Sequence, residues 1–167
     1  NHKSANPYQV LGVSYSSHAS PASGTQIIHA DLPGTDTETK VISTLFDGEF
    51  IHGSDATETR FKLTAPRYEI LHLALHGQSS ENFTALIFRQ GSDSLNDGIL
   101  HPYEIYGLKL NSRLAVLSAC SSGVGDLHVG EGLVSLASAF SYAGCPAVVM
   151  SLWDVGDQQT SALMQAF

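Results

Sequence analysis

A histidine and a cysteine, each placed where an apolar run gives way to small residues, are the residues of this chain best suited to chemistry. His76 precedes Gly77 at the end of the apolar run 68–77, and Cys120 stands in the stretch "LSACSSG". A thiol becomes a useful nucleophile when a neighbouring imidazole takes its proton or stabilises the thiolate. Histidine suits that task because its ordinary pKa is about 6.5. The two residues together predict an activated thiol with a histidine base.

The backbone beside these residues has a second use. Gly77 lets a substrate backbone approach closely, and its N–H together with that of Cys120 predicts an oxyanion hole. Loss of one such donor typically costs ~3–4 kcal/mol of transition-state stabilisation. A rival base, His72, lies inside the apolar run, where we expect a core histidine whose hydrogen bonds are satisfied.

Each of these residues also has an ordinary structural interpretation. A lone cysteine at a strand end is more often a small buried hydrophobic side chain, and one histidine among eight is more often a surface or core residue. The residues alone therefore leave both interpretations open for His76 and Cys120. Cys145, which precedes Pro146 at the start of an apolar run, is expected to lie in the packed core.

Other motifs do not predict ligand sites. With two cysteines and no CxxC pair, the chain predicts neither a disulfide framework nor a structural zinc site. The stretch "NDGIL" (96–100) resembles the start of a calcium loop but lacks the further spaced carboxylates, so we interpret it as a turn. The glycine-rich stretch "GVGDLHVGEG" (123–132) has no Lys-Ser/Thr after it, so we do not expect a phosphate-binding loop. We expect it to form a loop over the substrate cleft beside His76 and Cys120.

Apolar runs alternate with helical patterns along the chain. The expected strands cover residues 8–17, 49–53, 68–77, 83–91, 112–123 and 145–155, and the expected helices residues 31–48, 55–67, 101–110, 130–144 and 157–167. Runs that are apolar throughout are typical of strands buried on both faces, as in a parallel sheet. The alternation therefore predicts an α/β sandwich around a largely parallel sheet, with helices on both faces.

The predicted sheet positions the candidate residues. In open α/β sheets, sites form at the carboxyl ends of the strands. The runs that end near residues 77, 121 and 155 deliver His76, Cys120 and the pair Trp153–Asp154 to that edge. If the first two strands are neighbours, His76 and Cys120 lie side by side.

Charge and hydropathy exclude several classes of partner. The net charge is −8 with 8 Lys+Arg and no basic stripe, so we expect no direct binding to nucleic acid or to an anionic membrane surface. No apolar run approaches the roughly 18–20 residues that span a bilayer. Two isolated cysteines suit a reducing compartment, and we expect a cytoplasmic protein.

Several stretches resemble the CHAT family, caspase-like domains often joined to tetratricopeptide repeats. They are "LPGTDTETKVISTLF", "GSDATETRFK", "EILHLALHG", "NDGILHPYEIYGLKL" and the long block from "LAVLSACSSG" through "GEG" and "VVMSLWDV" to the chain end. They occur in family order from about residue 32 onward, and the last block is the most specific. The resemblance implies a single caspase-like domain over residues 1–167, a three-layer sandwich that lacks N-terminal family regions and is truncated at its C-terminus.

The resemblance also assigns roles to the matching positions. It implies a cysteine endopeptidase in which Cys120 is the nucleophile, His76 the base, and Gly77 and Cys120 the oxyanion-hole donors. The segment "SLWD", with Ser151, Leu152, Trp153 and Asp154, would edge the substrate cleft and pair with peptide backbone. The reaction is hydrolysis of a peptide bond in a protein substrate through a thioester, with no metal or organic cofactor.

Specificity and regulation follow less directly from the resemblance. Several caspase relatives that cleave after Arg or Lys carry an Asp two positions before the cysteine, where this chain has Ser118, another residue of the expected cleft. Asp154 could supply a carboxylate there or serve as a turn or cap residue, and an uncharged side chain is the expected preference. A repeat region of a longer chain, or a partner protein, is the expected regulator.

Two other functions remain open from the sequence. One is a catalytically silent caspase-like scaffold that binds a partner peptide in the cleft. The other is a cysteine amidase, which would need a GxCxG elbow where this chain has Ser118 and Ser122. We rank the amidase last.

Overall fold

The computed structural model describes residues 8–15, 33–80, 83–91, 96–118, 131–150 and 157–166. Five parallel strands form its main sheet, in the order β2-β1-β3-β7-β8. They are β1 (Val10–Ser14), β2 (Gly48–His52), β3 (Ile70–Ala74), β7 (Leu114–Leu117) and β8 (Ala147–Met150). The central strands are apolar on both faces, as burial between two helical layers requires.

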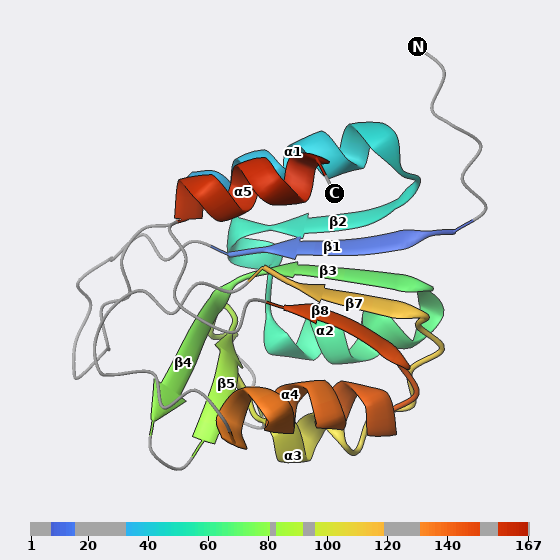
Figure 1. Cartoon of the computed structure of the whole chain (residues 1–167), viewed down its shortest axis with the longest axis vertical. Helices are drawn as coiled ribbons and strands as arrows, with labels where there is room; N and C mark the ends of the chain where they lie inside the picture. The colour runs from blue at the N-terminus through green and yellow to red at the C-terminus, as the bar shows by residue number, and fades with distance from the viewer. Residues whose placement is uncertain are drawn as a thin grey trace.

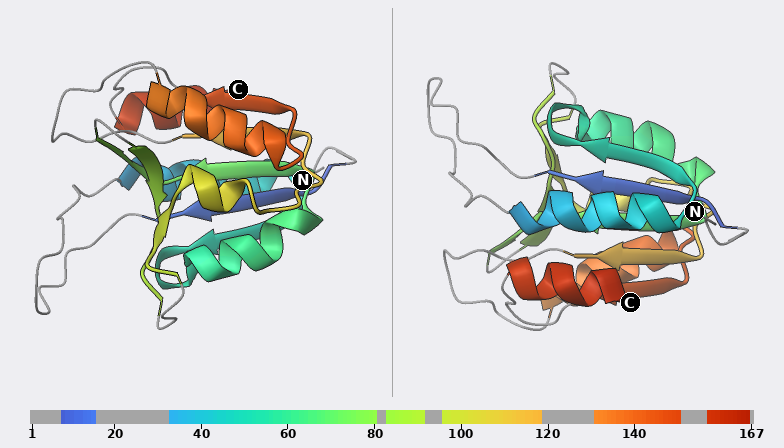
Figure 2. Two further views of the ribbon diagram at one scale, coloured as in Figure 1. Left: turned by 90° about the horizontal axis from the view of Figure 1, so that it is seen from below. Right: turned by 90° about the horizontal axis from the view of Figure 1, so that it is seen from above.

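Helices cover both faces of this sheet (Figure 1). One face carries α1 (Pro33–Leu45) and α5 (Asp157–Ala166), which lie side by side, as the right view of Figure 2 shows. The other face carries α2 (Glu58–Thr64), α3 (Pro102–Ile105) and α4 (Glu131–Tyr142), and 3-10 turns cover Gly53–Asp55 and Ala65–Arg67. The predicted three-layer α/β sandwich, built on a largely parallel sheet with helices on both faces, is confirmed.

The apolar run 68–77 departs from the prediction of one strand. Its first part is β3, but the chain leaves the main sheet at Leu75, and His76 begins β4 (His76–Ser80) of a second, antiparallel sheet. The hairpin partner of β4 is β5 (Phe83–Ile87), followed by the two-residue strand β6 (Ile99–Leu100), which the sequence did not predict. Leu75 is fully buried at the junction, so hydrophobicity alone does not mark the crossing.

Turn positions match the expected turn chemistry. Gly144, predicted to end α4, has a φ of +112°, and a Cβ there would stand 2.3 Å from the Leu110 carbonyl oxygen. Gly98 in the "NDGIL" stretch has a φ of +87°, and the Asp97 carboxylate accepts a bond from the Ile99 N–H. The chain thus bends at Gly98, whereas the last two residues of the stretch form β6.

The core is continuous through the sandwich and holds the predicted cysteine. Its largest fully buried side chains include Phe61, Phe140, Leu71 and Leu86. Cys145 is 0% exposed, its thiol donates to the Ala147 carbonyl, and burial raises its pKa. The core assignment of Cys145 is confirmed, and its thiol is a poor nucleophile for that reason. Within the described ranges, no helix combines the length and apolar character that crossing a membrane demands.

Candidate active site

The two strands that lead to the candidate dyad are direct neighbours. β3 and β7 pair in parallel, with Leu73 opposite Leu117. The Ser118 N–H continues the pairing past the end of β7 by donating to the Leu73 carbonyl at 2.9 Å. His76 lies three residues past Leu73, and Cys120 three residues past Leu117. The expected neighbouring strands are thus observed, and β3 and β7 end at the same edge of the sheet.

The predicted site residues fall partly inside the described structure. His76 is 0% exposed and is the first residue of β4, opposite Ile87 of β5. Gly77 follows it, half-buried, opposite Leu86. Cys120 and the "SLWD" residues Ser151, Leu152, Trp153 and Asp154 lie outside the described residues, so their roles remain predictions.

Ser118, predicted to line the cleft, points toward helix α1. Its side chain is buried, and its hydroxyl donates to Glu38 Oε2 at 3.0 Å. The other oxygen of the same carboxylate, Oε1, lies 2.6 Å from His72 Nε2. Glu38, His72 and Ser118, the buried polar cluster, are 1%, 5% and 4% exposed. The expectation that His72 is a core histidine with its bond satisfied is confirmed.

Sequence reasoning missed Glu38. It lies on the same helical face as Thr35, Thr39 and Ile42, all of which are buried. Glu38 is three residues after Thr35, on the helix face that packs on the sheet. A charged residue at such a position indicates a buried carboxylate with polar partners, and this could have been recognised from the sequence. Its partners, on β3 and after β7, come from distant parts of the sequence.

A second polar group lies at the same carboxyl edge, nearer β2. Ser14, the last residue of β1, donates to Asp36 Oδ1 at 2.7 Å, and its Oγ lies 2.8 Å from His52 Nδ1 at the end of β2. His52 Nδ1 is 4.0 Å from the same Asp36 oxygen. Ser14 and Asp36 thus both lie near the same ring nitrogen of His52. In a catalytic triad, by contrast, the two imidazole nitrogens contact different groups. The arrangement fastens α1 to the edge of the sheet.

His52 makes the stability of the fold depend on pH. Burial lowers its pKa, and Lys40 adds to this against the opposing charge of Asp36. The unfolded chain therefore binds a proton more readily at this residue than the folded chain does. We expect the free energy of unfolding to fall as the pH drops below about 6.5, the ordinary pKa of histidine. His52→Asn should reduce this fall in the free energy of unfolding, as measured by urea unfolding at a series of pH values. An unchanged pH dependence would exclude His52 as its source.

The antiparallel sheet that carries His76 is tied to α2 by a cluster around Lys62. The ammonium lies 2.5 Å from Glu58 Oε1 and 2.7 Å from both Glu104 Oε1 and Asn96 Oδ1. Glu58 Oε2 in turn accepts the Gly98 N–H at 2.9 Å, just before β6. Burial raises the pKa of Glu58 despite the bonds from Lys62 and Gly98. The cluster joins α2, α3 and the start of β6.

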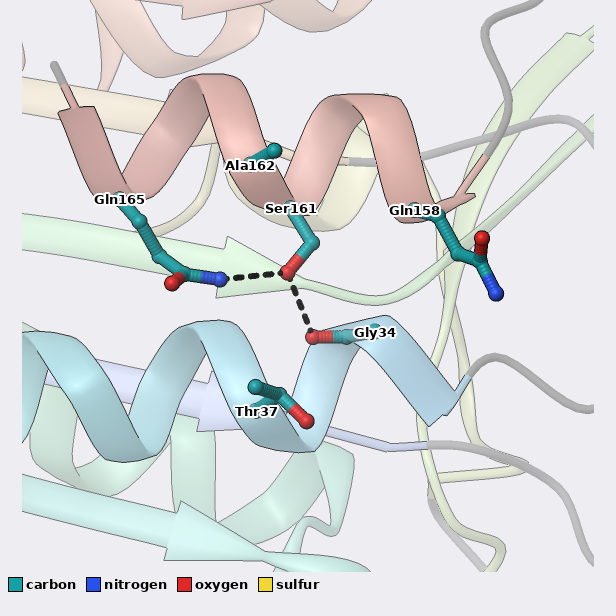
Figure 3. Close-up of a pocket in the computed structure, with 6 residues that line it drawn as sticks. All are labelled: Gly34, Thr37, Gln158, Ser161, Ala162 and Gln165. Carbon is teal, nitrogen blue, oxygen red and sulfur yellow. Dashed lines mark hydrogen bonds between the residues drawn. The ribbon is translucent and has the colours of Figure 1, made fainter.

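Helices α1 and α5 leave a groove of about 280 Å³ between them. Figure 3 shows Ser161 of α5 pointing across to α1, where its hydroxyl donates to the Gly34 carbonyl and accepts from Gln165. The groove is lined by small and amide side chains, and it lies below the usual range of ~300–1,000 Å³ for ligand pockets. None of the predicted site residues lines it, so it is not the candidate active site.

Within the described ranges, no three or more His, Cys, Asp or Glu side chains are grouped so as to hold a metal ion. The clusters found there are ion pairs and hydrogen bonds between protein groups.

Comparison with known proteins gives a family match over the whole chain. The sequence model of a family described as the CHAT domain matches residues 1–167. No curated protein matches. Among solved structures, the crystal structure of the Drosophila initiator caspase Dronc is similar at 14% identity and a TM-score of 0.43, over 71% of this chain and 50% of that chain. This chain thus spans half the length of that structure.

Proposed function

Because the chain belongs to the CHAT domain family, we propose that it is a caspase-like cysteine endopeptidase with Cys120 as nucleophile and His76 as base. The observation that supports the proposal is the parallel pairing of β3 with β7, the two strands that precede His76 and Cys120 in the sequence. The short distance along the chain supports it, since His76 and Cys120 each follow three positions after the paired Leu73 and Leu117 in the sequence.

The proposed reaction has two stages. His76 takes the proton from the Cys120 thiol, and the sulfur attacks the carbonyl carbon of the scissile peptide. The N–H groups of Gly77 and Cys120 stabilise the oxyanion that forms. The C–N bond then breaks, the leaving amine takes the proton from His76, and the acyl group remains on sulfur as a thioester. Water, deprotonated by His76, attacks the thioester and releases the carboxylate and the thiol.

The proposed substrate is an extended segment of a protein. β8 is the last strand in the described main sheet, and the "SLWD" residues follow directly after it. A peptide bound beside Ser151–Asp154 would satisfy its backbone by strand pairing, which explains how such a site accepts a chain rather than a small molecule.

Incubation with a mixture of defined-sequence peptides, followed by mass spectrometry, tests the activity. We expect new peptide termini with the wild-type chain and with Cys145→Ser, because Cys145 is buried away from the edge. Cys120→Ala and His76→Ala should generate none. Peptide binding without cleavage in the wild type would favour the silent scaffold instead.

A further inference from the structure

One buried carboxylate contacts both strands that lead to the proposed dyad. Glu38 Oε1 lies 2.6 Å from His72 on β3, four residues before His76. Glu38 Oε2 accepts from Ser118 at the end of β7, two residues before Cys120. One carboxylate oxygen thus contacts β3 and the other contacts the end of β7, and the residues of both contacts are buried.

We propose that Glu38 is a positioning residue that fixes the β3 and β7 strand ends relative to each other, and thereby His76 relative to Cys120. The inference rests on the proposed function. Glu38 would act through the two strand ends that it contacts.

Burial explains why this contact is stiff. A carboxylate removed from water needs hydrogen-bond donors on its oxygens, because an unpaired buried charge is costly. Glu38 is 1% exposed, so water offers little substitute for either donor. A change in the separation of the strand ends would stretch one of the two hydrogen bonds. The carboxylate therefore opposes both an increase and a decrease in that separation.

The contact lies beside the last backbone bond between β3 and β7 among the described residues. His72 lies opposite Gly12 on one side and Val116 on the other, and Ser118 comes two residues after Val116, on the same face of the sheet. Beyond the Ser118 N–H bond to Leu73, the chain of β3 turns away to start β4 at His76. The side-chain contacts of Glu38 therefore add to the backbone pairing of the two strands at this point.

The structure offers two variants and a matched control. Glu38→Gln removes the charge and leaves one acceptor oxygen in place of two. Ser118→Ala removes only the bond to β7 and is the milder change. Ser161→Ala is the control, because it also deletes a buried serine hydroxyl bonded to α1, but this hydroxyl comes from α5 and its printed partners are Gly34 and Gln165, neither of which is on β3 or β7.

Two measurements follow each variant. The first is amide hydrogen exchange at Ser118, which we expect to be at least about tenfold faster in Glu38→Gln and Ser118→Ala than in Ser161→Ala. The second is the rate of Cys120 alkylation between pH 5.5 and 8. A misplacement of about 1 Å can cost roughly 100-fold in rate, so we expect the His76-dependent acceleration to fall by about 10- to 100-fold. A role confined to global stability would leave the pH profile unchanged.

The outcomes separate this inference from the function on which it rests. Unchanged exchange at Ser118 in both variants would overturn the role of Glu38, whatever the activity. Faster exchange with an unchanged alkylation profile would also overturn it, because the strand end would then be held without effect on the dyad. If the wild-type chain itself shows no His76-dependent acceleration, the proposed function fails first, before any Glu38 variant is compared.

Discussion

Iodoacetamide at limiting concentration alkylates Cys120 of the wild-type chain at pH 6.5 about five- to tenfold faster than it alkylates Cys120 of the His76→Ala variant, if the proposed dyad is formed. An imidazole partner raises the thiolate fraction at this pH from about one in a hundred toward one half. The net gain is smaller than that increase, since a less basic thiolate is also a weaker nucleophile. Intact-mass spectrometry at short times measures both rates.

The pH profile discriminates more sharply than the rate at one pH. The wild-type rate should level off near neutral pH, whereas the His76→Ala rate should keep rising toward pH 8, as it does for an ordinary thiol. Cys145 supplies an internal reference, because it is fully buried and burial raises its pKa. Parallel profiles for the two chains would contradict the dyad.

Lys62→Met is expected to lower the free energy of unfolding by about 3–5 kcal/mol, because it leaves the buried Glu58 and the half-buried Glu104 without their cation. For a domain of this size that corresponds to a Tm lower by roughly 6–20 °C. Thermal unfolding followed by circular dichroism measures the change. The deficit should shrink as the pH falls, because protonation of Glu58, whose pKa burial already raises, removes the uncompensated charge.

Lys109→Met is the matched control for this substitution. Lys109 is exposed, so the same loss of charge should change stability by less than about 0.5 kcal/mol. Equal effects of the two substitutions would show that the Lys62 cluster does not stabilise the fold.

The parallel sheet was predictable from the sequence because its strands are apolar on both faces. The runs that became β3, β7 and β8 were identified in this way, and Gly144 marked the end of α4 by its freedom to adopt a positive φ. The second sheet was not predictable in the same way. Leu75 is buried whether the strand continues or crosses to another sheet, so the run 68–77 gave no sign that His76 begins a new strand.

For the candidate site, too, only part of the arrangement could be predicted from the sequence. The core role of His72 was predictable because apolar residues surround it in the sequence. His76 was chosen as a candidate because a glycine follows it at the end of an apolar run, and its role stays a prediction. The partners of Glu38 could not be predicted, since they are 34 and 80 residues away in the sequence. Helix periodicity places Glu38 on the buried face of α1 but says nothing about which strand side chains it meets.

The strand order has a consequence for how the chain folds during synthesis. β1, β2 and β3 occupy one side of the sheet and come from residues 10–74, whereas β7 and β8 come from residues 114–150. The three-stranded half-sheet and α1 are therefore synthesised first. The outer edge of β3 then stays unpaired until about 40 further residues have emerged, which takes several seconds at usual elongation rates. The Glu38–His72 contact belongs wholly to this early half, while Ser118 arrives with the late one. An open β3 edge invites pairing with other chains, so nascent chains stalled in this interval are the species we expect to need a chaperone.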